Sequence, residues 1–453
     1  MTFHHNLPRL TLALALASSG MAQEPTKSQA PKGMFEIGFE ERVRLEEYDN
    51  IIDHNDLNAS DLKSYYRFRT RAWITANPTS DLEISIGLCN ENRKIIQPNA
   101  AINAREIFFD TFYVDYKFSK AWSMRVGRQN LMRGEGFIIF DGGSQDGSRA
   151  AYFNALDLTY SWSQSKLEFL AISDPRKDKY LPRINEVQAP GSPQLLNEWD
   201  EQALGLYYTG KEWSGTSLEG YYFLKTEKND YRAISNAMFQ PDRRISTLGS
   251  RVVREIQNGW SVNGEFAYQW GNQDAKPGTT QGSRDIAAWG GYARVKKVVD
   301  SAWKPTFSVA YIAMSGQDPN ASKITAWDPI FSRWPRYSEL YIYSEVPEKG
   351  VAYTTNTGMW EAEVRLTPLP ALDLRATYYK MTARDAQVTI PTATFGTGKD
   401  RGDLLQLKAD YKFSPALKGH ILYEHLAPGT FYAGQSSGHF LRLEIAYLFK
   451  NRF

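Results

Sequence analysis

The stretch Asp403–Leu426 reads DLLQLKADYKF, SPA, LKGHILYEHL, and it contains the pattern on which the fold depends. Apolar residues occupy every odd position from 405 to 413, and polar residues lie between them. This period of two is typical of a strand with one apolar and one polar face. Ser414-Pro415-Ala416 is long enough only for a tight turn. The stretch therefore predicts two antiparallel strands joined by a short turn.

The same alternation recurs outward from this hairpin in both directions, whereas the 3.6-residue period of a helix is almost absent after Met34. Apolar and polar residues alternate again in 63–77 and in 356–366, for example. The predicted strands lie near 34–47, 64–76, 82–92, 107–118, 122–130, 151–162, 166–173, 201–209, 216–225, 245–256, 260–271, 285–295, 306–315, 356–367, 371–383, 403–413, 417–426 and 440–453.

The connections between these strands alternate between short and long. Short ones include 119–121, 163–165 and 414–416, whereas 174–200 and 316–355 are long and rich in polar residues, Gly and Pro. Outer-membrane barrels have this asymmetry, with tight periplasmic turns and long external loops, and a Greek-key sandwich has no reason to follow it. The sequence therefore predicts an all-β fold: a single transmembrane up-and-down antiparallel β-barrel of about 18 strands.

The two faces of the predicted strands also suit a membrane barrel. Aromatic residues lie near strand ends on the apolar face, as in Tyr116 and Phe118, where interfacial girdles are expected. Charged residues occupy the opposite face at mid-strand, which a dry protein core would not tolerate. The last strand alternates regularly to a terminal Phe453, which resembles the C-terminal signal read by the machinery that folds outer-membrane barrels.

Composition excludes several other classes of protein. The 453 residues contain 53 Lys and Arg against 51 Asp and Glu, so no excess charge is available to neutralise nucleic-acid phosphates. One cysteine, Cys89, excludes a disulfide framework and a cysteine-based zinc site. After the N-terminus no apolar run reaches the roughly 18 residues that a membrane helix needs. A protein that crosses the membrane with helices is excluded.

The N-terminus predicts export from the cytoplasm. Residues 1–22 contain a weakly basic start, the apolar stretch Leu10–Ala17, and small residues before Gln23, as in a cleavable signal peptide. Residues 23–33 are rich in Pro, Lys and Gln and are predicted to be a flexible leader. The barrel is then expected over 34–453, in the outer membrane of a Gram-negative cell after signal-peptide cleavage.

If the apolar face contacts lipid, the opposite face lines the pore, and arginine dominates its basic side. A guanidinium offers a planar fork of donors suited to carboxylates and sugar hydroxyls. These cations either contact an anionic ligand or pair with luminal acids such as Asp115, Glu361 and Glu444 in a ladder that stiffens the wall. The predicted pore-lining residues are Arg42, Arg44, Arg67, Arg69, Arg71, Arg125, Arg251, Glu265, Arg365, Arg375, Lys408 and Arg442.

The sequence resembles the alginate export porins, and the resemblance spans most of the mature chain. It rests on short pieces in order: Glu41–Arg44 (ERVR), Arg67–Arg71 (RFRTR), Val126–Gln129 (VGRQ), Arg133–Gly136 (RGEG), Thr247–Arg251 (TLGSR), Glu265–Gly271 (EFAYQWG), Ser315–Asp318 (SGQD) and Phe331–Arg333 (FSR). The resemblance implies a monomeric 18-stranded barrel that passes an anionic uronate polysaccharide.

In that family a luminal, arginine-rich constriction selects the anion. The resemblance implies that Arg67, Arg69, Arg71, Arg128 and Arg251 would form it here. Strict alternation from Val126 places Arg128 on the lipid face instead. Either a bulge changes the alternation there, or Arg128 lies above the hydrocarbon zone.

Signals for other chemistry are weak. His420 and His425 are five residues apart on one strand and so point to opposite faces, which argues against a shared metal ion. His425 has no identifiable serine partner for phospholipase chemistry. The glycine-rich stretch Asp141–Gly147 lacks the final Glu of an EF-hand calcium loop and is predicted to be an external loop. We expect no cofactor, no metal ion and no enzymatic activity.

The favoured hypothesis is an outer-membrane channel, expected to be monomeric, that passes an anionic oligo- or polysaccharide. The alternative is a general porin or one selective for another anion, such as phosphate or organic acids; an outer-membrane enzyme or adhesin is a remote third. A periplasmic export or uptake partner, in addition to membrane lipid, stays open. The loop 316–355 is expected to restrict the external mouth, because it is long and holds Trp327, Phe331, Trp334, Tyr337, Tyr341 and Tyr343.

Overall fold

The computed structural model describes residues 34–58, 62–97, 99–100, 102–103, 107–140, 153–184, 199–228, 241–275, 280–333 and 335–453. The predicted signal peptide and leader, the glycine-rich stretch 141–147 and Trp334 lie outside these ranges. The described part belongs to one compact unit, Lys32–Phe453.

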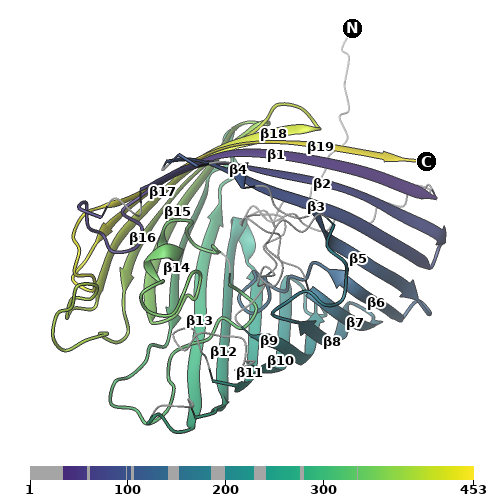
Figure 1. The fold of residues 1–453 in the computed structure, drawn as a ribbon. Helices are drawn as coiled ribbons and strands as arrows, with labels where there is room; N and C mark the ends of the chain where they lie inside the picture. Colours follow the sequence, from purple (N-terminus) through teal and green to yellow (C-terminus); the bar gives the residue numbers. More distant parts are fainter. Residues whose placement is uncertain are drawn as a thin grey trace. The chain divides into compact units, whose positions relative to one another are not determined.

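Antiparallel strands form one closed sheet in this unit (Figure 1). Each wall strand pairs with its neighbours in the chain, and the first strand, β1, pairs with both β2 and β19, which closes the barrel. The wall strands within the described residues are β1 (Phe35–Asp49), β2 (Lys63–Thr79), β3 (Leu82–Gln97), β5 (Ile107–Lys117), β6 (Trp122–Gln129), β7 (Phe153–Trp162), β8 (Ser165–Asp174), β9 (Asp200–Gly210), β10 (Thr216–Lys228), β11 (Arg243–Glu255), β12 (Trp260–Gln273), β13 (Arg284–Val298), β14 (Thr306–Met314), β15 (Thr357–Leu369), β16 (Leu372–Thr382), β17 (Asp400–Lys412), β18 (Leu417–Pro428) and β19 (Gly438–Arg452).

The predicted fold class is confirmed: the wall is an 18-stranded antiparallel barrel. The short strand β4 (Ile102–Asn103) pairs only with β3, so it does not add a wall strand. Predicted and observed strand ends agree within three residues, except that β3 continues to Gln97 instead of ending near 92. No helix within the described residues is long and apolar enough to cross a membrane.

Tight turns close one end of the barrel, here called the turn end, and longer connections leave the other, the loop end. Between β11 and β12 the chain reverses at Asn258 and Gly259, both with positive φ (61° and 76°). A Cβ at position 259 would collide with the carbonyl oxygen of Val298, so glycine is required there. Turns this short fix the register of each hairpin and so the face on which every side chain lies.

Alternation along the strands separates an outward apolar face from an inward polar one. Aromatic rings form contacts on the outward face near the turn end, as in Trp122 and Tyr160, whose ring centroids are 4.7 Å apart. The aromatic girdle predicted from the sequence is therefore present at this end. Exposed apolar residues of the outward face include Phe39, Tyr66, Val126, Leu206, Leu248, Phe266, Val309, Leu407 and Ile445.

Two loops fold inward and pack on each other. Ile139, after β6, forms a parallel bridge with Phe331 of the connection 315–356 between β14 and β15. Phe137 stacks on Trp327 at a centroid distance of 5.3 Å, and both rings belong to the buried cluster that includes inward wall residues such as Tyr292. The same connection contains the four-residue helix α1 (Tyr341–Ser344). The interior is therefore partly filled by loop side chains.

Candidate functional site

Arginines form rows across the inward faces of β1, β2 and β3. Arg44, Arg67 and Arg93 lie directly opposite one another on the three strands. In the next row Arg42 faces Arg69, which in turn faces Glu91. Directly opposite side chains share one face of a sheet and lie within contact distance. Like charges in such rows require acids close by.

Those acids are present. The Glu46 carboxylate lies 2.6 Å from Arg442, 3.4 Å from Arg67 and 3.7 Å from Arg44. Arg44 also pairs with Glu444. The second strand's other arginines are paired too: Arg69 with Glu40 and Arg71 with Asp110, each at 2.6 Å. This is the arrangement that a structural ladder requires.

A second basic row crosses β15, β16 and β17. Arg365 lies opposite Arg375, and Arg375 lies opposite Lys408. Arg365 pairs with Asp373, and Lys408 Nζ lies 2.8 Å from Asp410. Arg375 stands between two paired cations.

The remaining predicted pore residues lie on other strands. Arg125 of β6 pairs with Asp115 at 2.8 Å. Arg251 of β11 pairs with Glu219 at 2.6 Å. Glu265 of β12 accepts hydrogen bonds from the hydroxyls of Tyr221 and Tyr292. All three predicted residues face inward, where alternation placed them.

The loop after β6 brings a carboxylate toward this wall. Glu135, between two glycines with positive φ, accepts a hydrogen bond from Arg294 of β13 at 2.9 Å. Burial would raise the pKa of Glu135, but Arg294, Arg336 and Arg251 lower it below its usual value. Glu135 is therefore held as a carboxylate among three guanidinium groups.

The connection 315–356 is anchored to the wall at several points. Gln269 of β12 exchanges two hydrogen bonds with the backbone of Asp328, and Lys225 of β10 donates to the carbonyl of Ile330 at 2.9 Å. Arg442 reaches Glu339 at 3.0 Å. These contacts come from strands far apart in the sequence, so the loop is tied across the interior. The predicted aromatic residues Trp327, Phe331, Tyr337 and Tyr341 are buried there, and Tyr343 packs against them.

Three half-buried arginines of the interior differ from the paired arginines described above. Arg93, Arg336 and Arg375 have no carboxylate oxygen within 4.0 Å among the described residues. Arg93 lies 4.5 Å from the ring centroid of Tyr65, and Arg336 lies 5.1 Å from those of both Phe137 and Tyr292. Aromatic faces attract cations but do not neutralise them. We call these residues the unpaired cations.

Sequence reasoning identified Arg375 but missed the other two. Arg93 lies on the same inward face of β3 as Cys89 and Glu91. It was not among the predicted pore-lining residues because the predicted strand ended near residue 92. Arg336 lies in a loop, and a loop has no alternation from which the direction of a side chain can be predicted. Arg133 and Arg294, which contact luminal carboxylates, were missed as well.

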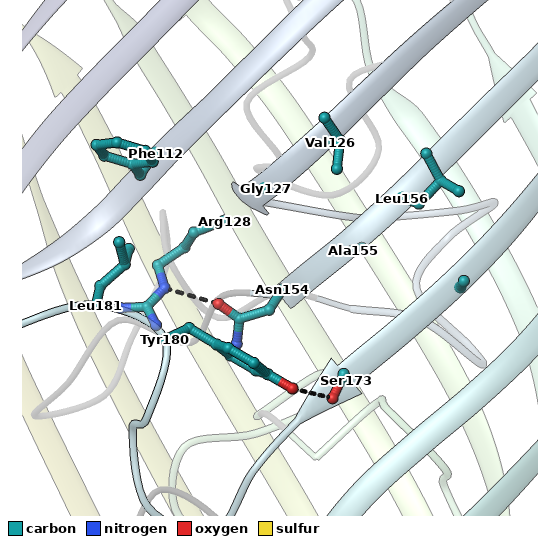
Figure 2. Close-up of a pocket in the computed structure, with 11 residues that line it drawn as sticks. Phe112, Val126, Gly127, Arg128, Asn154, Ala155, Leu156, Ser173, Tyr180 and Leu181 are labelled. Atoms are coloured by element: carbon teal, nitrogen blue, oxygen red, sulfur yellow. Dashed lines mark hydrogen bonds between the residues drawn. The ribbon is translucent and has the colours of Figure 1, made fainter.

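Arg128, predicted as a pore-lining residue, is not on the luminal face. It lies opposite Phe112 of β5 and Asn154 of β7, on the outward side (Figure 2). It forms two 2.8 Å contacts with Asp178 and donates to Asn154 and to the carbonyl of Phe109. Strict alternation along β6 therefore predicted the face of Arg128 correctly, whereas the family resemblance did not. The segment that follows β8 covers Arg128 and supplies Asp178, so the charge on the outward side is buried and paired.

Comparison with solved structures supports the fold. The chain is similar to Pseudomonas aeruginosa OprD (TM-score 0.56, 14% identity, 94% of this chain and 96% of that one). It is also similar to Acinetobacter baumannii OccAB1 (0.57, 13%, 92% and 98%). A third is Pseudomonas aeruginosa OccK2, solved in complex with glucuronate (0.55, 10%, 93% and 100%). At these identities the similarity concerns the fold alone, that of an outer-membrane channel.

Among curated proteins, none matches the chain. The family model described as alginate export matches residues 90–441, well over half of the sequence. The match covers β5 to β18 in full and contains six of the eight short motifs on which the resemblance rests. The chain therefore belongs to the alginate export family.

Proposed function

We propose that this outer-membrane channel passes an anionic saccharide of the uronate class, alginate-like in its chemistry, as a monomer. Family and fold indicate a transport channel. A similar channel, OccK2, has been solved with glucuronate, which carries the carboxylate that such a substrate would present. The charges of the interior support an anionic substrate more directly.

The observation that carries the proposal is the set of unpaired cations. Arg44, Arg67 and Arg69 are at most 4% exposed and lie beside acids, so their charge is largely used within the wall. The unpaired cations are only half buried, and no carboxylate oxygen of the described residues lies within 4.0 Å of them. A guanidinium binds a carboxylate with two parallel hydrogen bonds, a geometry that suits a uronate.

Their positions suit passage along the channel. Arg93 lies near the loop end of β3, Arg375 near the turn end of β16, and Arg336 in the inward-folded loop between them in the chain. Conduction requires binding that is strong enough to attract the ion and weak enough to release it. Separate single guanidinium sites meet that requirement better than one cluster would.

The test is block of single-channel current by an oligouronate. In planar bilayers, wild-type current should be interrupted by a uronic-acid oligosaccharide more than by a neutral oligosaccharide of equal length. The triple variant Arg93→Gln, Arg336→Gln, Arg375→Gln should lose that difference. The matched control Arg244→Gln, Arg254→Gln, Arg384→Gln changes three exposed arginines on the outward side and should keep it.

Inorganic phosphate serves as the competing anion. If phosphate relieves or reproduces the block at equal charge concentration, the channel selects anions in general and the uronate proposal is wrong. If wild-type and triple variant are blocked equally, the unpaired cations are not the binding groups.

A further inference from the structure

A cavity opens on the outward side of the barrel, between the wall and the segment 175–184 that follows β8. Its volume is about 310 Å³. Figure 2 shows the wall side of it, where Phe112, Val126 and Leu156 lie beside Arg128. Phe112 and Val126 are each 41% exposed, so the cavity is accessible from outside. It continues the lipid-facing apolar surface of the barrel.

The segment 175–184, here called the strap, is fixed at both ends. Tyr180 and Ser173 of β8 share a hydrogen bond at 2.6 Å, and Ile184 pairs with Ile107 at the start of β5 through two backbone hydrogen bonds. Between these points the Asp178 carboxylate pairs with Arg128, and both side chains are 1% exposed. The strap thus crosses from β8 to β5 on the outward side, and Tyr180 and Leu181 line the cavity.

The strap is also basic. Its sequence, PRKDKYLPRI, contains Arg176, Lys177, Lys179 and Arg183 against one acid, Asp178. Arg128 already occupies that acid. Lys177 and Lys179 are exposed, so at least two cations stand beside the entrance to an apolar cavity.

The strap lies at the loop end, which faces the outer leaflet in barrels of this kind. We infer that the cavity holds one acyl chain of a phosphorylated, multiply acylated glycolipid of the lipid A class, with its phosphate on Lys177 and Lys179. The cavity is at the lower end of the range for ligand sites, roughly 300–1,000 Å³, which suits one hydrocarbon chain. Apolar walls and a basic rim match the two parts of such a lipid.

Lipid retention by the purified full-length chain tests the inference. Native mass spectrometry in detergent, after incubation with hexa-acyl lipid A, should show one retained lipid. Ala171→Trp places an indole in the cavity and should reduce the retained fraction about tenfold, because the indole displaces buried methylenes of the acyl chain. The matched control Leu248→Trp, also lipid-facing but on β11 and away from the cavity, should retain the lipid. Equal retention by both variants would overturn the site.

The headgroup is tested separately. Lys177→Gln with Lys179→Gln should weaken retention severalfold, since both lysines attract an anionic headgroup. The control pair Lys120→Gln and Lys211→Gln lies in exposed turns at the other end and should have no effect. If dioleoylphosphatidylglycerol is retained as well as lipid A, the site is a general acyl-chain groove and the proposed lipid class is wrong. None of these variants alters the channel interior, so conductance should match wild type in all of them.

Discussion

Arg67 and Arg375 both point into the barrel, but the structure surrounds them differently. Arg67 is 4% exposed and lies 3.4 Å from Glu46, whereas Arg375 is half buried between Arg365 and Lys408 with no carboxylate of its own in the described residues. An arginine's position on a face can be read from alternation. Its partner comes from another strand or a loop, and that partner decides whether the charge remains available to a ligand.

The buried ion pair between Arg128 and Asp178 allows a test of whether a charge partner holds the strap on the wall. Replacing Arg128 with Met leaves the buried Asp178 carboxylate without its guanidinium, and breaking a buried ion pair in this way typically costs about 3–5 kcal/mol. The strap should therefore detach and become sensitive to trypsin at Arg176, Lys177 and Lys179. Limited proteolysis followed by mass spectrometry locates the cuts. Arg254→Met, at an exposed position, should leave the strap resistant, and resistance in Arg128→Met as well would mean that the ion pair does not hold it.

His54 gives the barrel a pH-dependent contact. It is fully buried in the connection between β1 and β2, 3.3 Å from the Ser344 hydroxyl and 4.5 Å from the Tyr432 ring centroid. Burial lowers the pKa of His54 to about 4, against about 6.5 in an unfolded chain. Between these pH values the unfolded chain binds a proton that the folded chain does not, so this contact's stabilisation is complete above about pH 6.5 and declines toward pH 4.

Thermal unfolding of the detergent-solubilised protein between pH 7.5 and 4.5 checks this expectation. The midpoint should fall with pH in wild type and fall less in His54→Gln, which has no proton to gain. Identical pH profiles in wild type and His54→Gln would show that His54 does not contribute.

At the scale of elements, the strands were predictable and the packing of the loops was not. Asp403–Leu426 alternates with period two because one face of β17 and β18 meets lipid and the other meets water, so sequence alone fixed their bounds within three residues. Loops have no such period. Nothing local in Gly134–Gly136 or Arg336 indicates that these residues turn inward, because the partners that hold them, Phe137, Tyr292 and Arg294, become neighbours only when the barrel closes.

The connection 315–356 provides the test at this scale. Deleting 327–353 removes Trp327, Ile330 and Phe331 from the interior and should raise single-channel conductance severalfold while the strands still pair. Deleting Pro319–Ser322 from the same connection removes exposed residues for the most part and should leave conductance unchanged. Conductance is measured in planar bilayers at fixed salt. Equal conductance of both deletions and wild type would mean that the loop does not restrict the channel.

At the scale of the whole molecule, charge on the wall has two roles. Paired arginines and acids link neighbouring strands around the barrel, from Arg44 and Glu444 to Arg365 and Asp373. The unpaired cations lie on the inward side of a chain whose formal net charge is only +2. Net charge therefore gives no indication of the proposed anion selectivity, because the relevant quantity is the local charge on one face.

The arginines of β2 that are paired with acids should contribute to the stability of the barrel. Replacing Arg67, Arg69 and Arg71 with Gln leaves Glu46 without one of its arginines and leaves Glu40 and Asp110 without the partners shown here. We expect a barrel that unfolds at lower urea concentration, measured by heat-dependent mobility on gels, and partial recovery when Glu40→Gln and Asp110→Asn are added. A triple variant with wild-type stability but lost selectivity would instead assign these arginines to the substrate path.

The most direct test of the central claim is the reversal potential of the channel in a potassium chloride gradient. We predict that wild type is anion-selective and that the variant with Arg93, Arg336 and Arg375 replaced by Gln loses most of this selectivity. The control with Arg244, Arg254 and Arg384 replaced by Gln should retain it. Cation selectivity in wild type, or an unchanged reversal potential in the first variant, would contradict the claim that the unpaired cations attract the anion.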